Sequence, residues 1–223
     1  MTWFANEILA QATPELVAEV VAFPGYRDSS YLIRSLASHP FHCDEVRHGV
    51  PAAGLLVVQP VGEPEDVSTG GDSPVVPWLP PPGWPIASLE LRGSAVSRVV
   101  PDLPDSALPP DDFLGALKAL AARHRTTVAY AYFSTFGGSN ELEYAWVFAD
   151  REYVLVNTLP DQAQHLSITP GNEPARVAKG LIESLCPLLG FDLPTWFFAP
   201  HTRDFPWEEH RPTRLARRTG HGT

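Results

Sequence analysis

Apolar residues recur with a helical period in the segment that begins at Asp111. They lie three and four residues apart, at Phe113, Leu114, Leu117, Leu120 and Ala121. Two acids open the segment and basic residues close it, an arrangement that matches the partial charges at the two ends of a helix. The pattern therefore predicts an α-helix from Asp111 to about Arg125.

Three segments rich in β-branched and aromatic residues follow this helix, at 127–133, 142–148 and 153–156. Short polar or Gly-containing stretches separate them, as the turns of β-hairpins do. A helix followed by sequential strands is typical of an α+β fold. The chain is therefore predicted to form an antiparallel sheet, with a meander in residues 126–157 and helices packed on one face.

Two further helices and two further strands are predicted outside the meander. Thr13 is a good cap for a helix over residues 14–23, and apolar residues at helical spacing predict another helix over residues 173–186. The segments 54–59 and 85–91 have the composition of strands.

Prolines and charges divide the chain into a body and a tail. The 24 prolines are dense between residues 62 and 85, where they predict a long exposed Pro-rich loop. Trp78, Leu79 and Trp84 indicate that part of this loop packs against the body. Residues 1–210 are predicted to form a single compact domain. Residues 211–223, which hold four arginines and no acid, are predicted to form a flexible basic tail.

The body is strongly acidic. The whole chain carries a formal charge of −10, from 26 acidic and 16 basic residues. Without the four arginines of the tail, residues 1–210 hold 12 basic and 26 acidic residues, a charge of −14. Such a body repels nucleic-acid phosphates and attracts basic surfaces. A basic protein partner is therefore expected, without direct nucleic-acid binding, although acidity also serves solubility.

Neither the apolar runs nor the cysteines indicate export or membrane insertion. Charge, Pro or Gly interrupts every apolar run before the roughly 18 residues that a membrane span needs. The first residues lack the basic start of a signal peptide and hold Glu7 where an apolar stretch would be needed. Cys43 and Cys186 are too few for a disulfide framework. These features predict a cytoplasmic protein that does not contact a membrane.

Side chains able to bind a metal gather at His39, His42, Cys43 and His48. Their spacing, with Pro40 between the first two, matches no standard zinc site. The chain also lacks the Walker A, G-x-G-x-x-G and G-x-S-x-G motifs. The sequence therefore predicts no metal, no cofactor and no catalytic residue.

Partner-binding residues are predicted along the second strand of the hairpin and in the turn after it. If that strand is regular, Glu141 and Glu143 share one face. Tyr144 and Trp146 are of residue types enriched in interfaces, and Asp150 adds a charge in the turn. These five residues predict an acidic and aromatic contact surface. A solvated strand end and ordinary core packing are the alternatives.

A helix, the strand 127–133, the turn Phe136-Gly137-Gly138 and the Trp-containing strand 144–148 follow one another between residues 113 and 156. This segment, about a fifth of the chain, resembles the core of some bacterial immunity-type proteins, which neutralise a cognate toxin. The resemblance implies a toxin as the partner and brings no catalytic residues with it.

Three functions are compatible with these features. The leading hypothesis is a cytoplasmic partner-binding protein, immunity- or antitoxin-like, whose acidic surface neutralises a basic toxin. One alternative is an enzyme whose site is assembled from residues distant in the sequence, among them His39, His42 and His48. The other is a structural subunit that docks its aromatic C-terminal region on a larger assembly.

Overall fold

The structure is a computed structural model, and it describes residues 3–35, 50–59, 80–89, 108–136, 139–158, 163–167, 175–177, 181–191 and 207–212. The histidines and cysteine between residues 39 and 48 lie outside the described residues. So do residues 62–79 of the predicted Pro-rich loop and residues 213–223 of the predicted tail. No helix in the described ranges is long and apolar enough to cross a membrane.

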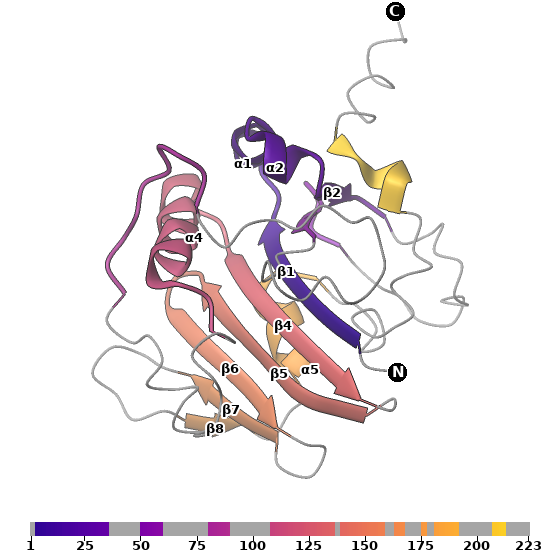
Figure 1. Cartoon of the computed structure of the whole chain (residues 1–223), viewed down its shortest axis with the longest axis vertical. Coiled ribbons are helices and arrows are strands. Elements are labelled where there is room, and N and C mark those ends of the chain that lie inside the picture. Colours follow the sequence, from indigo (N-terminus) through magenta and orange to yellow (C-terminus); the bar gives the residue numbers. More distant parts are fainter. Residues whose placement is uncertain are drawn as a thin grey trace, which may run out of the picture.

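The described strands form one antiparallel sheet in the order β2-β3-β1-β4-β5-β6-β7-β8 (Figure 1). Their bounds are β1 (Trp3–Gln11), β2 (Ser30–Ile33), β3 (Leu55–Val58), β4 (Val128–Phe136), β5 (Ser139–Phe148), β6 (Glu152–Thr158), β7 (Ala163–Ser167) and β8 (Ala175–Val177). From β4 to β8 each strand pairs with the next one in the chain. The predicted α+β class and the antiparallel meander are therefore confirmed.

Consecutive residues of the central strands belong to two separate buried clusters, one on each face of the sheet. Tyr130 and Tyr144 belong to the cluster that also contains the helix 111–124, whereas Ala129 and Ala145 belong to the cluster that contains residues 181–189. Because side chains alternate along a strand, these clusters are the two faces of one sheet. We call them the α4 face and the α5 face, after the helices that cover them.

Three helices lie on the α4 face: α1 (Pro14–Val21), α2 (Pro24–Arg27) and α4 (Asp111–His124) (Figure 1). Thr13 caps α1, because its hydroxyl oxygen accepts a hydrogen bond from the Leu16 amide at 3.1 Å. The helices 14–23 and 111–125 were predicted close to these bounds. Glu19 of α1 pairs with Arg123 of α4 at 2.6 Å, which joins the two helices above the sheet.

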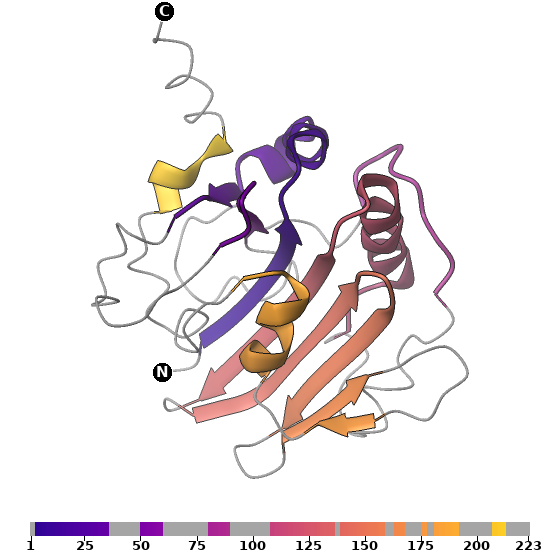
Figure 2. The same ribbon diagram turned by 180° about the vertical axis from the view of Figure 1, so that it is seen from behind.

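Helix α5 (Leu181–Leu188) covers the opposite face, as the view from behind shows (Figure 2). This placement corrects the expectation that all helices share one face. The physical reason is that β1, β3, β4 and β5 carry buried apolar side chains on both faces, so the second face also needs a cover. The side chains beneath α5 include Ala129, Ala131 and Ala145, which are short and leave room for a helix.

Two element predictions were wrong. The helix predicted over 173–186 starts only at Leu181, and residues 175–177 form β8, because Arg176 pairs across to Leu166 of β7. Pairing with a neighbouring strand has overridden the local helical pattern. Of the strand predicted over 85–91, residues 85–89 form no strand. The strand predicted over 54–59 is confirmed as β3.

Residues 80–89 instead lie along the outer side of α4. The Ala87 amide donates to the Gly115 carbonyl at 3.0 Å, and the Lys118 ammonium donates to the Ser88 carbonyl at the same distance. Trp84 of this segment is buried against Phe23 and Tyr26, with ring centroids 5.2 and 5.4 Å away. The prediction that part of the loop packs down is confirmed for Trp84, whereas Trp78 and Leu79 lie outside the described residues.

Gly115 permits this close contact, and its substitution tests it. A Cβ atom at position 115 would lie 2.5 Å from the Ala87 carbonyl oxygen, a backbone atom that cannot turn aside. We expect Gly115→Ala to lower the free energy of unfolding by about 1–3 kcal/mol, as overpacking does, despite the better helix propensity of Ala. The measurement is urea denaturation followed by circular dichroism.

Gly25→Ala is the matched control, because a Cβ added to that helical glycine meets nothing within 4 Å. It should leave stability unchanged or raise it slightly. Equal unfolding midpoints for the two variants would contradict the contact between residues 80–89 and α4.

Candidate functional site

The structure buries three of the five predicted partner-binding side chains. Tyr144 and Trp146 lie on the α4 face with exposed fractions of 0% and 2%. The Tyr144 ring stacks on Tyr132 at 4.8 Å and meets the Trp146 ring edge-on at 5.5 Å. Glu143 is buried as well. These side chains belong to the interior and are not available to a partner, which corrects the expectation of a contact surface there.

The other two predicted partner-binding residues are Glu141 and Asp150. Glu141 interrupts the β4–β5 ladder, and Asp150 lies in the turn after β5. Ser134 faces Leu142 and Thr135 faces Asn140, so Glu141 is an extra residue in the ladder, a β-bulge. The regular strand that would place the two glutamates on one face is therefore interrupted. Asp150 is exposed in the turn between β5 and β6.

The most unusual polar side chain of the described residues is Glu7, in the middle of β1. It lies between β3 and β4, opposite Ala131 in the β1–β4 register, and only 3% of its surface is exposed. Gln59, which follows β3, donates a side-chain hydrogen bond to one carboxyl oxygen. The other oxygen, Oε2, is buried without a hydrogen-bond partner in the described part of the chain.

Burial controls the protonation of Glu7. Loss of contact with water disfavours the charged carboxylate and raises the pKa of Glu7 to about 7, while the hydrogen bond from Gln59 opposes this shift only in part. Near neutral pH this carboxyl group therefore exists in both protonation states. A group of this kind can exchange a proton with a bound molecule or sense pH.

A second buried carboxyl group lies on the same face of the sheet. Glu143 of β5 faces Phe133 of β4, whereas Glu7 faces Ala131, two residues along the same strand. The two glutamates thus flank the short side chains of the α5 face from strands on either side of β4. We define Glu7 and Gln59, which share a hydrogen bond, as the carboxyl site.

Sequence reasoning missed the carboxyl site because it treated Glu7 only as an interruption of the first apolar segment. The usable signal is the position of Glu7 directly before the run Ile8-Leu9-Ala10, which is apolar at successive residues. Such a run is typical of a strand buried on both faces, where an acid has no exposed side to occupy. Gln59 carries no comparable signal.

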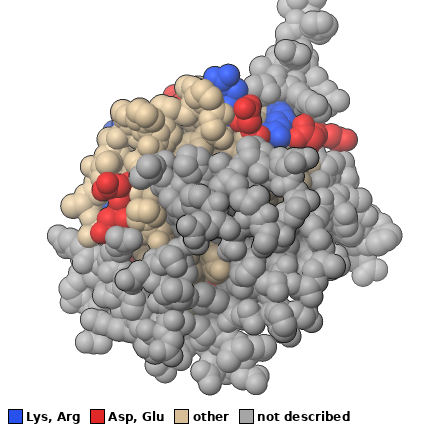
Figure 3. Space-filling view, in the orientation of Figure 1, with Lys and Arg blue, Asp and Glu red and all other residues tan. Residues whose placement is uncertain are grey.

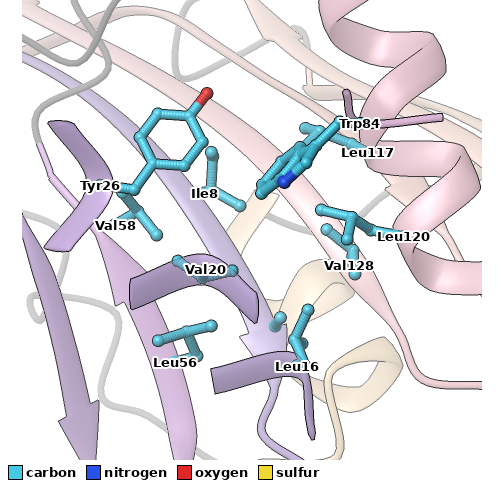
Figure 4. A pocket seen from close by; sticks show the side chains of 11 residues that line it. Ile8, Leu16, Val20, Tyr26, Leu56, Val58, Trp84, Leu117, Leu120 and Val128 are labelled. Carbon is cyan, nitrogen blue, oxygen red and sulfur yellow. The ribbon is translucent and has the colours of Figure 1, made fainter. Parts of the chain in front are cut away.

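An apolar cavity lies elsewhere, between the sheet and the helices of the α4 face (Figure 4). Its walls come from β1, β3, β4, α1, α4 and residues Tyr26 and Trp84. The cavity volume is about 10 Å³, so it holds one water molecule at most. We therefore regard it as a packing defect of the core.

In the described ranges no group of three or more His, Cys, Asp or Glu side chains is placed to hold a metal ion. Cys186 is buried on the α5 face. The chain matches no protein-family model, no curated protein and no solved structure.

Replacing Glu7 tests its protonation. The unfolded chain releases this proton near the ordinary pKa of 4.5, whereas the folded protein keeps it until about 7. The folded state therefore binds more protons between these values, and stability falls as the pH rises through this window. We expect Glu7→Gln to remove this fall and to raise the free energy of unfolding at pH 8, relative to the unmodified protein, by on the order of 3 kcal/mol.

The measurement is urea denaturation at pH 4.5, 6, 7 and 8, with Glu15→Gln as the control because Glu15 is exposed on α1. The control should reproduce the pH dependence of the unmodified protein. A Glu7→Gln curve that runs parallel to both would show that folding does not shift the pKa of Glu7.

Proposed function

We propose that the chain is a partner-binding protein of the immunity type, whose acidic surface covers a basic protein. The charge of −14 over residues 1–210 is the observation that carries this proposal. A surface with an excess of one charge increases the rate at which an oppositely charged protein associates with it and determines their relative orientation. The resemblance of residues 113–156 to immunity-type proteins supports the same function.

Ion pairs within the structure use charges of both signs. Lys118 pairs with Glu152, Arg123 with Glu19 at 2.6 Å, and Arg211 with Glu208 at 2.7 Å. Each pair removes one positive and one negative charge together, so the excess of acids over the chain is the same with or without these pairs. In the space-filling view, acidic side chains of the described residues appear at the left margin and, next to basic side chains, at the upper right (Figure 3).

One flank of α4 is suited to such a partner. Asp111 lies seven residues, or about two turns, before Lys118 and thus on the same side of the helix. Lys118 contacts Glu152, which is two residues beyond the exposed Asp150 in the β5–β6 turn. Asp111 and the exposed Asp150 therefore lie on the same flank, and Asp150 is one of the predicted partner-binding residues.

The carboxyl site favours a second candidate function, an enzyme that uses Glu7 for proton transfer. A carboxyl group that titrates near neutral pH is a common general acid or base. An activity that is lost in Glu7→Gln while the variant keeps its fold would support this function over partner binding.

Affinity purification tests the leading proposal. We expect the tagged protein to recover one stoichiometric basic protein from its own cells at about 50 mM salt, and less of it at about 300 mM, because salt screens the attraction. Mass spectrometry identifies the partner. Recovery of the tagged chain alone at both salt concentrations would contradict the proposal.

Charge reversal then locates the surface. Asp150→Lys should slow association with the recovered partner by roughly 3- to 10-fold and leave dissociation nearly unchanged, since charges at an interface rim act mainly on the association rate. Glu15→Lys on α1 is the control, because it changes the net charge by the same amount at a different exposed position. Surface plasmon resonance measures both rates, and equal slowing by the two variants would exclude this flank as the contact surface.

A further inference from the structure

A short segment near the C-terminus packs against the end strand of the sheet. The 3-10 helix η5 (Trp207–His210) lies beside β2 (Figure 1). The Trp207 ring lies 5.0 Å from the ring of Tyr31 on β2, and the Arg211 guanidinium lies 4.6 Å from the centre of the same ring. We call residues 207–211 the cap.

The cap also binds the backbone at this edge. Arg211 donates a hydrogen bond to the carbonyl oxygen of Asp28, just before β2, and His210 is hydrogen bonded to the backbone of Leu32 within β2. In the described sheet β2 is the first strand of the order, with β3 as its neighbour. End strands carry backbone groups that can pair with an added segment, and proteins commonly cover them.

The contacts of the cap are of a kind that opens at low cost. Its helix has four residues, and none of them is buried. The contacts that Trp207, His210 and Arg211 make with β2 and Asp28, described above, come from their side chains, whereas a backbone ladder holds each strand. Elements with little buried surface are those that open locally before the rest of a fold.

The chemistry of the cap shows what the site beneath it can hold. Tyr31 offers a ring that accepts an aromatic neighbour and a guanidinium group, and cation–π contact favours arginine for the second. Asp28 adds a backbone acceptor for that guanidinium and a carboxylate that acts on it through space. The fixed part of the site therefore favours a segment that carries an arginine and an aromatic side chain.

We propose that the β2 edge, with Tyr31 and Asp28, is a docking site for an arginine- and aromatic-containing segment of the basic partner, and that the cap occupies this site in the free protein. The inference rests on the proposed function for the identity of the partner. The partner segment displaces the cap, stacks on Tyr31 and adds to the edge of β2, a known mode of peptide recognition.

The experiment uses the full chain with Trp207→Ala and Arg211→Ala, which remove the side chains that hold the cap. The probe is a fluorescein-labelled peptide of residues 205–213, Phe-Pro-Trp-Glu-Glu-His-Arg-Pro-Thr. In the unmodified protein the attached cap competes with the peptide at a high effective concentration. We therefore expect the double variant to bind the peptide at least 10-fold more tightly by fluorescence anisotropy.

Three controls isolate the site. Glu209→Gln, at an exposed position of η5, should behave as the unmodified protein, and adding Tyr31→Ala to the double variant should abolish peptide binding. A peptide with Ala and Gln in place of its Trp and Arg should not bind. Arg211→Gln alone is a milder variant for use if the double variant has a lower melting temperature. Equal peptide affinities of the capped and uncapped proteins would overturn the inference.

The two proposals fail separately. If the double variant and the unmodified protein recover a basic partner equally well from cells, the docking site is wrong while the proposed function stands. If the peptide binds the uncapped protein but no basic partner is recovered, the proposed function fails and the site is a docking site without that partner. Stronger recovery by the double variant supports both.

Discussion

Burial of the central sheet on both faces is the constraint on which the rest of this structure depends. Successive side chains at residues 128–131 of β4 and 144–148 of β5 enter two different cores, so these parts of the strands have no side that faces solvent. Each face then needs its own cover, which α1, α2 and α4 supply on one side and α5 on the other. The hydrophobic contribution is large, because each fully buried large apolar side chain contributes on the order of 2 kcal/mol.

The two faces of the sheet are packed with side chains of different size. Tyr130, Tyr144 and Trp146 fill the α4 face, and their rings contact one another and Phe113 of α4. Alanines occupy the matching positions of the α5 face. The short side chains of the α5 face leave room for the buried carboxyl groups of Glu7 and Glu143. Aromatic rings of the size found on the α4 face would fill that space. The aromatic packing of one face and the carboxyl site of the other thus both follow from the alternation of side chains along the strands.

Local patterns were sufficient where an element is amphipathic or ends in a clear signal. The helix beginning at Asp111, the helix beginning at Pro14 and the hairpin that follows residue 126 were predictable, because spacing, caps and turn residues agreed. The strand β1 was not predicted, since a strand buried on both faces shows no alternation of apolar and polar residues. The segment 173–177 carried a helical pattern that pairing with β7 overrode. These failures share one cause, the dependence of strands on distant partners.

The candidate sites show the same limit. Asp150 lies in a turn that the sequence marks clearly, and it is exposed. Glu7 and Gln59 meet only because β1 and β3 pair, and Tyr31 meets Trp207 only because the chain returns to β2 from its far end. No pattern in the local sequence indicates either contact, so these residues can be identified as neighbours only from the fold.

The position of β1 has a consequence for how the chain reaches this fold during synthesis. Ala10 pairs with Val128 and Trp3 with Thr135. Roughly 120 residues of sequence therefore separate β1 from β4, the strand with which it forms its longest ladder. Pairing over such a separation requires closure of a long loop and is slow compared with forming the β4–β5 hairpin. A ribosome releases β1 well before β4 exists, and the apolar side chains of β1 remain uncovered through that interval. A chaperone that shields this segment would therefore act at the stage when the chain is most prone to aggregate.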